Sequence, residues 1–340
     1  MTPQQMQIQR KERTKMFENL VEILKENPRK IVFTEGPDAR ILEAADRLKK
    51  GGFLTPVLVG KVDEVKAAAK AGGFDIEGLD ILDPAEYPEM EEMVAKMVEL
   101  RKGKMTEEQC RDALQKGNYF GTMLVKMGKA DALLGGATYS TADTVRPALQ
   151  LIKTKPGNKS VSSVFIMVRE HEDGSAPEIL GMGDCAINIK PSAEEIAECA
   201  VESARTAKIF GVDPKVAMLS YSTKGSGAGE DVDKMVEATK LAQEAAPELD
   251  IDGELQFDAS VSPVVAKTKC KDSKVAGQAN VFIFPDINAG NIGYKIAQRL
   301  GGFDAYGPVL QGLNAPINDL SRGCNAEEVY TMAIITAALA

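Results

Sequence analysis

Short runs of β-branched residues alternate with longer amphipathic stretches along most of the chain. The first repeat predicts a buried strand at residues 30–34, a turn with an N-cap at 36–38, and a helix at 39–50 whose apolar residues recur with helical spacing. The same order continues with strands at 56–59, 80–82 and 131–135, helices at 62–71, 89–100, 106–115 and 119–127, and a helix at 141–152. This alternation is typical of stacked βαβ units, so it predicts an α/β fold with doubly wound, largely parallel sheets.

The pattern changes after residue 153. A polar turn cluster at 154–159 is followed by two apolar runs, at 161–168 and 179–183, which an acidic loop at 170–174 connects. Two strands joined by a short polar loop predict an antiparallel hairpin. The α/β alternation then resumes with helices at 193–210, 231–246, 262–267 and 290–300 and strands at 215–219, 253–257 and 280–284.

The length of 340 residues favours two domains, because a single core would be near its upper size limit. We expect the first domain at 1–154 together with 308–340 and the second at 155–307, with the cleft between them as the natural place for a site. The last helix is predicted at 326–339. Its apolar end, residues 332–340, has about half the length of a membrane span, which favours a buried helix or a subunit contact.

The charge balance excludes some classes of partner. A net charge of −9 disfavours nucleic acid or an anionic membrane, since both normally require a basic face. His171 is the single histidine, so a zinc site built on several histidines is excluded, and catalysis by a Ser-His-Asp or Cys-His arrangement has one candidate. Its acidic neighbours in a predicted loop favour a solvated side chain.

The cysteines indicate a reducing compartment. There are five, they are widely spaced, and none forms a C-x-x-C pair, so neither a disulfide framework nor a metal knuckle is indicated. The first thirty residues are charged throughout and lack the apolar core of a secretion signal. We therefore expect a cytoplasmic protein.

Three glycine-rich segments are candidates for binding an anion, because glycine lets backbone N–H groups approach a phosphate at a helix N-terminus. The segment 224–229 matches neither a P-loop nor a dinucleotide fingerprint, so it is either an anion loop or a connector. The segment 135–143 is followed by Arg146, and its hydroxyls at Ser140 and Thr141 would open a helix. The alternative there is a capped helix with a surface arginine. The segment 288–293 is equally compatible with a plain cap.

The densest group of polar side chains lies at residues 312–324 and combines a hydroxyl, a carboxylate, a guanidinium and a thiol within a few residues. Such a cluster indicates a site. Cys324 is a candidate nucleophile if Arg322 and a helix N-terminus favour its thiolate, although a small residue before a helix more often serves packing.

Several of these motifs together resemble the phosphate acetyltransferases of the phosphate acetyl/butyryltransferase family. The resemblance rests on residues 308–312 (PVLQG), 314, 316, 318–323 (NDLSRG), 140–150 (STADTVRPALQ), 33–36 (FTEG), 221–227 (YSTKGSG) and 284–291 (FPDINAGN). It covers nearly the whole chain, and motifs in this order are more specific than any one of them. It implies reversible acetyl transfer between acetyl phosphate and coenzyme A, with coenzyme A as a substrate and no metal or redox cofactor. It also implies a two-domain architecture like that of isocitrate and isopropylmalate dehydrogenases, with the site in the interdomain cleft, and a homodimer.

The residues fit this chemistry. Because an acyl phosphate is already activated, the protein mainly has to hold two polyanions together and supply a thiolate. By the family's pattern, Arg322 and Arg146 contact substrate phosphates, Arg101 helps to grip coenzyme A, and Ser321 polarises the developing oxyanion. The predicted substrate-binding set is Arg101, Ser140, Thr141, Arg146, Asn288, Asn291, Asn318 and Asp319.

A carboxylate is needed to help remove the thiol proton, since a free thiol has a pKa of about 8.5. The family places an aspartate seven residues after the serine, and this chain has Glu328 there. Asn325 and Glu328 also spell a capping box, in which the helix dipole would make Glu328 a poorer base. Asp319 is the backup carboxylate, although an Asx contact that stabilises a turn is the simpler role for it.

Three rival functions remain at this point. Phosphate butyryltransferase shares the chemistry and differs in the acyl pocket. An NAD-dependent decarboxylating dehydrogenase would need clustered aspartates for a divalent metal beside a lysine and a tyrosine, and the sequence shows no such arrangement near these motifs. A catalytically silent regulatory domain is disfavoured by the intact Ser321-Arg322 pair.

Overall fold

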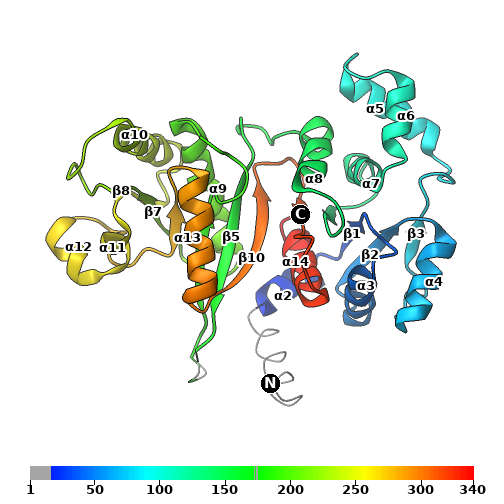
Figure 1. Ribbon diagram of the computed structural model, residues 1–340, viewed down its shortest axis with the longest axis horizontal. Helices are drawn as coiled ribbons and strands as arrows, with labels where there is room; N and C mark the ends of the chain where they lie inside the picture. The colour runs from blue at the N-terminus through cyan, green and yellow to red at the C-terminus, as the bar shows by residue number, and fades with distance from the viewer. Residues whose placement is uncertain (1–16, 172, 174) are drawn as a thin grey trace. The chain divides into compact units, whose positions relative to one another are not determined.

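The computed structural model describes residues 17–171, 173 and 175–340 (Figure 1). The chain forms two compact units. Unit 1 consists of the residues up to Pro156 together with Leu313–Ala340, and unit 2 consists of Gly157–Gly312. Each unit has its own sheet, and the α/β architecture agrees with the fold that the alternation predicts.

The sheet of unit 1 has five parallel strands in the order β11-β4-β1-β2-β3. Its strands are β1 (Arg29–Phe33), β2 (Leu54–Val59), β3 (Asp80–Leu82), β4 (Ala132–Gly135) and β11 (Ile317–Asp319). Ile31, Val32 and Phe33 are fully buried. A continuous apolar run is expected for a central parallel strand, which is covered on both faces.

The helices of unit 1 follow the strands in the predicted order, apart from the first helix, which precedes β1 and was not predicted. They are α2 (Glu18–Glu26), α3 (Ala39–Gly51), α4 (Val62–Gly72), α5 (Met90–Arg101), α6 (Glu107–Leu114), α7 (Gly117–Lys126), α8 (Thr141–Pro147), a π-helix (Ala148–Ile152) and α14 (Ala326–Ala338). Asp38 caps α3 by accepting a hydrogen bond from the backbone N–H of Arg40. Helix α14 packs against α2, α3 and β4 (Figure 1), so the apolar C-terminal segment is a buried helix, as predicted.

One helix was expected at 141–152, and the structure divides it in two. Helix α8 ends at Pro147, and the next turn is the π-helix. Proline has no N–H to donate to the helical ladder, so the regular pattern is interrupted at this position. A π-turn is often found at a functional site.

Unit 2 contains a mixed six-stranded sheet in the order β10-β5-β6-β9-β7-β8. Its strands are β5 (Ser162–Arg169), β6 (Glu178–Gly183), β7 (Lys215–Leu219), β8 (Asp250–Leu255), β9 (Val281–Ile283) and β10 (Asp304–Gln311). Strands β5 and β6 pair antiparallel, which confirms the predicted hairpin. The pairs β6–β9, β9–β7 and β7–β8 are parallel.

The helices of unit 2 are α9 (Ala193–Ile209), α10 (Glu230–Ala245), α11 (Phe257–Val261), α12 (Pro263–Lys269) and α13 (Ile287–Leu300). Strand β8 begins three residues before the predicted strand at 253–257. The polar residue that opens it, Asp250, is paired in register with Lys215 of β7 and forms an ion pair with it. Within the described residues, none of the helices has the length and apolar character needed to cross a membrane.

The chain passes back to unit 1 later than the sequence indicated. Residues 308–311 were expected in the first domain, but they belong to β10, which pairs antiparallel with β5 in the second sheet. A register shift between Tyr306 and Val309 lets the strand continue past Pro308. The units therefore divide after residues 156 and 312 rather than after 154 and 307.

Candidate active site

Three polar segments meet at one edge of the unit 1 sheet. Strands β1, β4 and β11 are parallel neighbours, so the residues that follow them emerge at the same edge: Thr34 and Glu35 after β1, Gly136–Ser140 after β4, and Leu320–Cys324 after β11. Ligands of doubly wound α/β proteins bind at the carboxyl ends of the strands. The topology thus joins the two motif segments, near 140 and near 321, that the sequence analysis selected.

Asp319 links these two segments directly. It is buried, and its carboxylate accepts hydrogen bonds from the hydroxyls of Thr141, at 2.6 Å, and Thr144, at 2.5 Å. Burial raises the pKa of Asp319, and the two hydroxyls partly oppose that shift. The predicted Asx contact is wrong, because Asp319 is the last residue of a strand and its two carboxylate oxygens accept from hydroxyls of α8. At Gly136, where φ is +98°, a Cβ atom would collide with this carboxylate, so glycine is required there.

The predicted catalytic residues lie on the loop after β11. Ser321 and Arg322 are exposed, and Ser321 Oγ accepts a hydrogen bond from the N–H of Gly323 at 3.3 Å. Glu328 is also exposed and lies in the first turn of α14. It completes the capping box: Asn325 Oδ1 accepts from the N–H of Glu328, and Glu328 Oε2 accepts from the N–H of Asn325. The capping alternative is therefore observed, and the base role stays a prediction.

The thiol of Cys324 lies in a different environment from the one that would favour a nucleophile. The side chain is buried, and the guanidinium that reaches Sγ, at 3.6 Å, is that of Arg40 and not that of Arg322. Burial raises the pKa of Cys324 to about 11, and the positive charge of Arg40 offsets only part of the shift. This thiol is therefore protonated at neutral pH.

The hydroxyls that open α8 have partners within unit 1. Ser140 Oγ donates to Asp143 Oδ2 at 2.6 Å, and Thr141 donates to Asp319. Asn318 is fully buried, and its amide donates to Thr336 Oγ1 at 2.9 Å. In this structure Thr141 and Asn318 hold elements of unit 1 together, and their roles as substrate ligands stay predictions.

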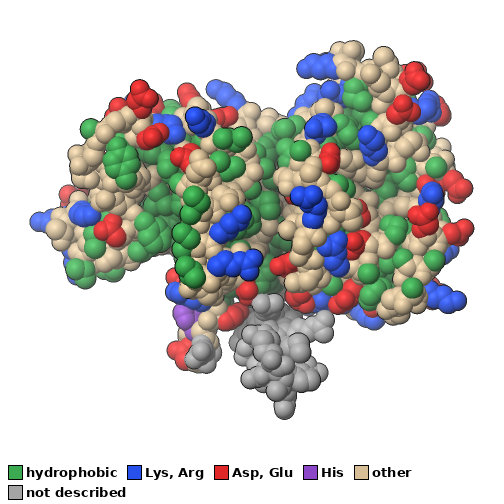
Figure 2. Space-filling view, in the orientation of Figure 1, with side chains coloured by type: hydrophobic (Ala, Val, Ile, Leu, Met, Phe, Trp, Pro, Cys, Tyr) green, Lys and Arg blue, Asp and Glu red, His purple; other side chains and the backbone are tan. Residues whose placement is uncertain are grey.

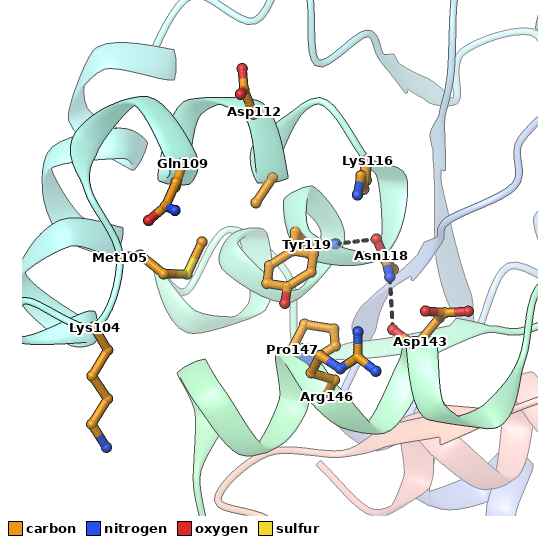
Figure 3. Close-up of a pocket in the computed structure, with 11 residues that line it drawn as sticks. Lys104, Met105, Gln109, Asp112, Lys116, Asn118, Tyr119, Asp143, Arg146 and Pro147 are labelled. Carbon is orange, nitrogen blue, oxygen red and sulfur yellow. Dashed lines mark hydrogen bonds between the residues drawn. The ribbon is translucent and has the colours of Figure 1, made fainter.

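Arg146 lines a pocket of about 400 Å³ in unit 1 (Figure 3). The phenol ring of Tyr119 lies in its middle, with Arg146 and Pro147 beneath the ring. Its further lining residues are Lys104, Met105, Gln109, Asp112, Ala113, Lys116, Asn118 and Asp143. The amide of Asn118 donates to the carbonyl of Asp143 at 2.7 Å and so fixes α7 against α8. This size lies within the range of small-molecule sites.

Arg101 belongs to the surroundings of the same pocket. Burial raises the pKa of Tyr119, whereas the positive charges of Arg146 and Arg101 act to lower it, so both guanidinium groups lie within electrostatic range of the phenol. Among the described residues, Arg101 Nε is a buried nitrogen that has no hydrogen-bond partner. Two arginines that sequence separates by 45 positions are thus brought to one place.

The remaining sequence candidates lie in unit 2. Helix α13 is capped by Asp286, whose Oδ1 accepts from the N–H groups of Asn288 and Ala289. Asn291 donates its amide to the carbonyl of Cys185 at 3.1 Å. These contacts agree with the plain cap. Asn288 and Asn291 belong to unit 2, and their ligand roles stay predictions.

The glycine-rich segment 224–229 binds a carboxylate of its own unit. Glu254 Oε1 accepts from the N–H of Gly225 and from Ser222 Oγ, both at 2.8 Å. Ser222 Oγ in turn accepts from the N–H of Gly227 at 2.8 Å. The connector alternative is thus favoured for this loop. His171 is exposed in the connection between β5 and β6.

Some residues that hold the loops of the site through hydrogen bonds to their backbone were not predicted from the sequence. Glu35, which follows β1, and Arg40, in the first turn of α3, contact the backbone of the loops after β4 and β11. Tyr119 was predicted only as the start of a helix, and Asn118 was not selected. The motif Thr34-Glu35-Gly36 was noted, but nothing local shows which distant backbone groups its carboxylate meets.

Fold and site together define an α/β protein with arginines and hydroxyls around the carboxyl ends of parallel strands, where the ligands of doubly wound folds bind. The sequence profile of the family described as "Phosphate acetyl/butaryl transferase" matches residues 15–337. The chain therefore belongs to the phosphate acetyl/butyryltransferase family and is an acyltransferase.

Similar proteins agree with this assignment. The chain is 57% identical over 311 residues to a phosphate acetyltransferase of Bacillus subtilis (strain 168), with 92% of this chain and 94% of that protein covered. A crystal structure of a phosphotransacetylase from Streptococcus pyogenes matches with a TM-score of 0.92 and 55% identity, over 96% of this chain and 98% of that one. A 4-hydroxythreonine-4-phosphate dehydrogenase from Burkholderia phymatum is 14% identical with a TM-score of 0.52, over 92% of this chain and 98% of that one, which shows a shared fold alone.

Proposed function

We propose that this chain catalyses the reversible transfer of an acetyl group between acetyl phosphate and coenzyme A. The observation that carries the proposal is the match with the phosphate acetyltransferase of B. subtilis, at 57% identity over 92% of the chain. The clustering of Arg322, Ser321 and the α8 segment at the end of the parallel strands supports it. No metal or redox cofactor is required, because acetyl phosphate is already activated and coenzyme A enters as a substrate.

The pocket beside Arg146 is proposed as the binding site of coenzyme A. Its cationic side chains Lys104, Lys116 and Arg146 suit the phosphates of that ligand, and Arg101 adds a guanidinium close to Tyr119. The buried Nε of Arg101 has no partner in the described part of the chain, which supports this role, because an unpaired buried donor is costly unless a ligand accepts from it.

Arg322 and Ser321 are proposed to act at the reacting phosphate and carbonyl. Both are exposed at the end of β11, so they are free to meet a ligand there. The thiolate of coenzyme A attacks the acetyl carbon, the carbonyl oxygen becomes an oxyanion, and the C–O bond to phosphate breaks as the carbonyl re-forms. Donors aimed at such an oxyanion are typically worth 10²- to 10³-fold in kcat. Glu328 accepts the thiol proton through the carboxylate that also caps α14.

The transfer is proposed to be direct, within a ternary complex. The side chain that would most plainly form an acyl-enzyme, Cys324, is buried and has a pKa of about 11. A protonated thiol is a poor nucleophile. The acetyl group therefore passes from phosphate to coenzyme A without a covalent acyl-enzyme intermediate.

The function is tested by mixing the purified protein with coenzyme A and either acetyl phosphate or butyryl phosphate and following the absorbance of the thioester. We expect rapid thioester formation with acetyl phosphate, slower formation with butyryl phosphate, and no effect of NAD. Faster reaction with butyryl phosphate would identify the protein as a phosphate butyryltransferase instead. No thioester with either ester would overturn the proposal.

We further propose that the protein is a homodimer that associates through α13. Three apolar side chains are exposed at four-residue spacing along this helix: Ile292 (58%), Ile296 (54%) and Leu300 (84%). Figure 2 shows hydrophobic side chains along α13. The stripe is symmetric about Ile296, so an antiparallel second copy would place Ile292 against Leu300, as a two-fold interface requires.

Light scattering at known protein concentration tests the dimer. Ile296→Asp should yield monomers, while Val236→Asp, which changes an exposed apolar residue of α10, should leave the mass unchanged. A wild-type monomer, or an Ile296→Asp dimer, would contradict the assignment.

A cytoplasmic location is proposed as well, because all five cysteines are unpaired thiols, as expected in a reducing compartment.

A further inference from the structure

The turn between β1 and α3 touches both loops that carry the proposed substrate ligands. Its first residues follow β1 at the end of the sheet, and Arg40 lies in the first turn of α3. We infer that Glu35 and Arg40 are positioning residues for the acetyl transfer, a role that rests on the proposed function. From this one turn they fix the backbone of the Gly136–Thr138 loop and of the Ser321–Cys324 loop.

Glu35 holds the loop after β4 by accepting hydrogen bonds. Its Oε1 accepts from the N–H of Thr138 at 2.6 Å and from Thr138 Oγ1 at 2.9 Å. Its Oε2 accepts from the N–H of Gly136 at 3.1 Å and from Thr34 Oγ1 at 3.2 Å. An ionised carboxylate offers acceptors only, so it matches these four donors. The loop it holds leads directly into Ser140 and α8.

Arg40 holds both loops by donating to their carbonyl groups. Nη1 donates to the carbonyls of Arg322, at 2.9 Å, and Cys324, at 3.1 Å, and Nη2 donates to the carbonyl of Ala137 at 2.9 Å. The planar guanidinium reaches these three carbonyls from two nitrogens at once, which the single amine of a lysine cannot reproduce.

Asp38 keeps this guanidinium in place. Its carboxylate accepts from Nε and Nη2 of Arg40 at 3.0 and 2.8 Å. Burial alone would raise the pKa of Asp38, but the hydrogen bonds and the charge of Arg40 outweigh it and lower the pKa. The pKa of Arg40 is raised by the same hydrogen bonds. The pair therefore stays ionised across the neutral range.

Neither Glu35 nor Arg40 has a hydrogen bond to the side chain of Ser321 or Arg322 among the described residues; Arg40 contacts the carbonyl of Arg322, and both of those side chains stay exposed. The effect of Glu35 and Arg40 on the reaction is thus indirect: they set where the loops present those side chains. A displacement of about 1 Å at a reacting centre costs on the order of 100-fold in rate. The alternative is that Arg40 binds a substrate phosphate as a charge, which predicts a different kinetic pattern.

The test compares two conservative variants with two matched controls. Glu35→Gln exchanges one acceptor oxygen for an N–H₂ group that faces backbone N–H donors. Arg40→Lys keeps the positive charge but loses the planar guanidinium that reaches three carbonyls through two nitrogens. Glu64→Gln and Arg47→Lys are the controls. Glu64 pairs with Lys61, and Arg47 lies on the same helix as Arg40 but contacts the side chain of Glu327. Thermal unfolding first verifies that each protein is folded, and Glu35→Asp replaces Glu35→Gln if the latter fails.

We expect kcat to fall by about 100-fold in both variants with little change in either KM, and to stay near wild type in the controls. Hydrogen exchange of the substrate-free proteins should become faster in the peptides containing residues 136–138 and 321–324, because local opening sets the exchange rate. Near-normal kcat with unchanged exchange would overturn the inference. Activity rescued by lysine, with a salt-dependent rise in KM alone, would assign Arg40 to direct phosphate binding instead.

Failure of the proposed function is distinguishable from failure of this inference. If wild-type protein forms no thioester, the function is wrong, and the exchange measurement still reports whether Glu35 and Arg40 order the loops. If wild-type protein is active and the variants match it, only the positioning role is wrong.

Discussion

An acyl-enzyme mechanism would need a reactive thiol at Cys324, whereas direct transfer does not. The expected rate at which Cys324 reacts can be worked out from the environment of its thiol. Burial raises its pKa to about 11, against about 8.5 for a free thiol. At pH 8 the thiolate fraction is then about 0.001 for Cys324 and about 0.24 for a free thiol, a difference on the order of 200-fold. The thiol is also covered by protein, which slows any reagent further.

The assay is labelling by a thiol reagent under native conditions, with the peptide that contains Cys324 quantified by mass spectrometry. We expect labelling at pH 8 at least about 200-fold slower than for a small free thiol, rising close to tenfold per pH unit up to pH 10. Labelling at the rate of a free thiol, with no increase above pH 9, would show that Cys324 is neither covered nor raised in pKa.

Three further predictions concern catalysis and stability. Arg322→Ala should lower kcat/KM by about 10²- to 10³-fold in the thioester assay without changing thermal unfolding, since its side chain is exposed; near-normal kinetics would remove it from the mechanism. Glu328→Gln should unfold at the wild-type temperature, because glutamine also completes a capping box, yet turn over more slowly at neutral pH; unchanged kcat would leave Glu328 with the cap alone. Phe120→Ala should lower the free energy of unfolding in urea by about 3–5 kcal/mol, because the ring is fully buried, whereas Leu149→Ala, at an exposed position, should cost little; equal effects would contradict the packing described.

The order of strands and helices was predictable because it depends on local spacing. The run at 30–34, the hairpin runs at 161–168 and 179–183, and the helix at 326–339 all match observed elements within a few residues. Strands β10 and β11 were not predicted. Their Gly, Pro, Asn and Asp residues are poor strand formers by themselves, and it is the neighbouring strands β5 and β4 that hold them.

The polar contacts of the candidate site were less predictable, because they join residues far apart in the chain. Thr141 and Asp319 are separated by 178 positions, and Arg40 is separated from the carbonyl of Arg322 by 282. Periodicity carries no signal for such pairs. In the glycine-rich segment at 224–229, the N–H of Gly225 donates to the carboxylate of Glu254, a residue of strand β8, so the composition of that loop alone left its role open.

The intact mass of the protein after mixing with acetyl phosphate alone tests the central claim of direct transfer most directly. Direct transfer predicts an unmodified mass in the absence of coenzyme A, and acetyl-coenzyme A only when both substrates are present together. An increase by one acetyl group that appears with acetyl phosphate alone, and disappears on adding coenzyme A as the thioester forms, would contradict it.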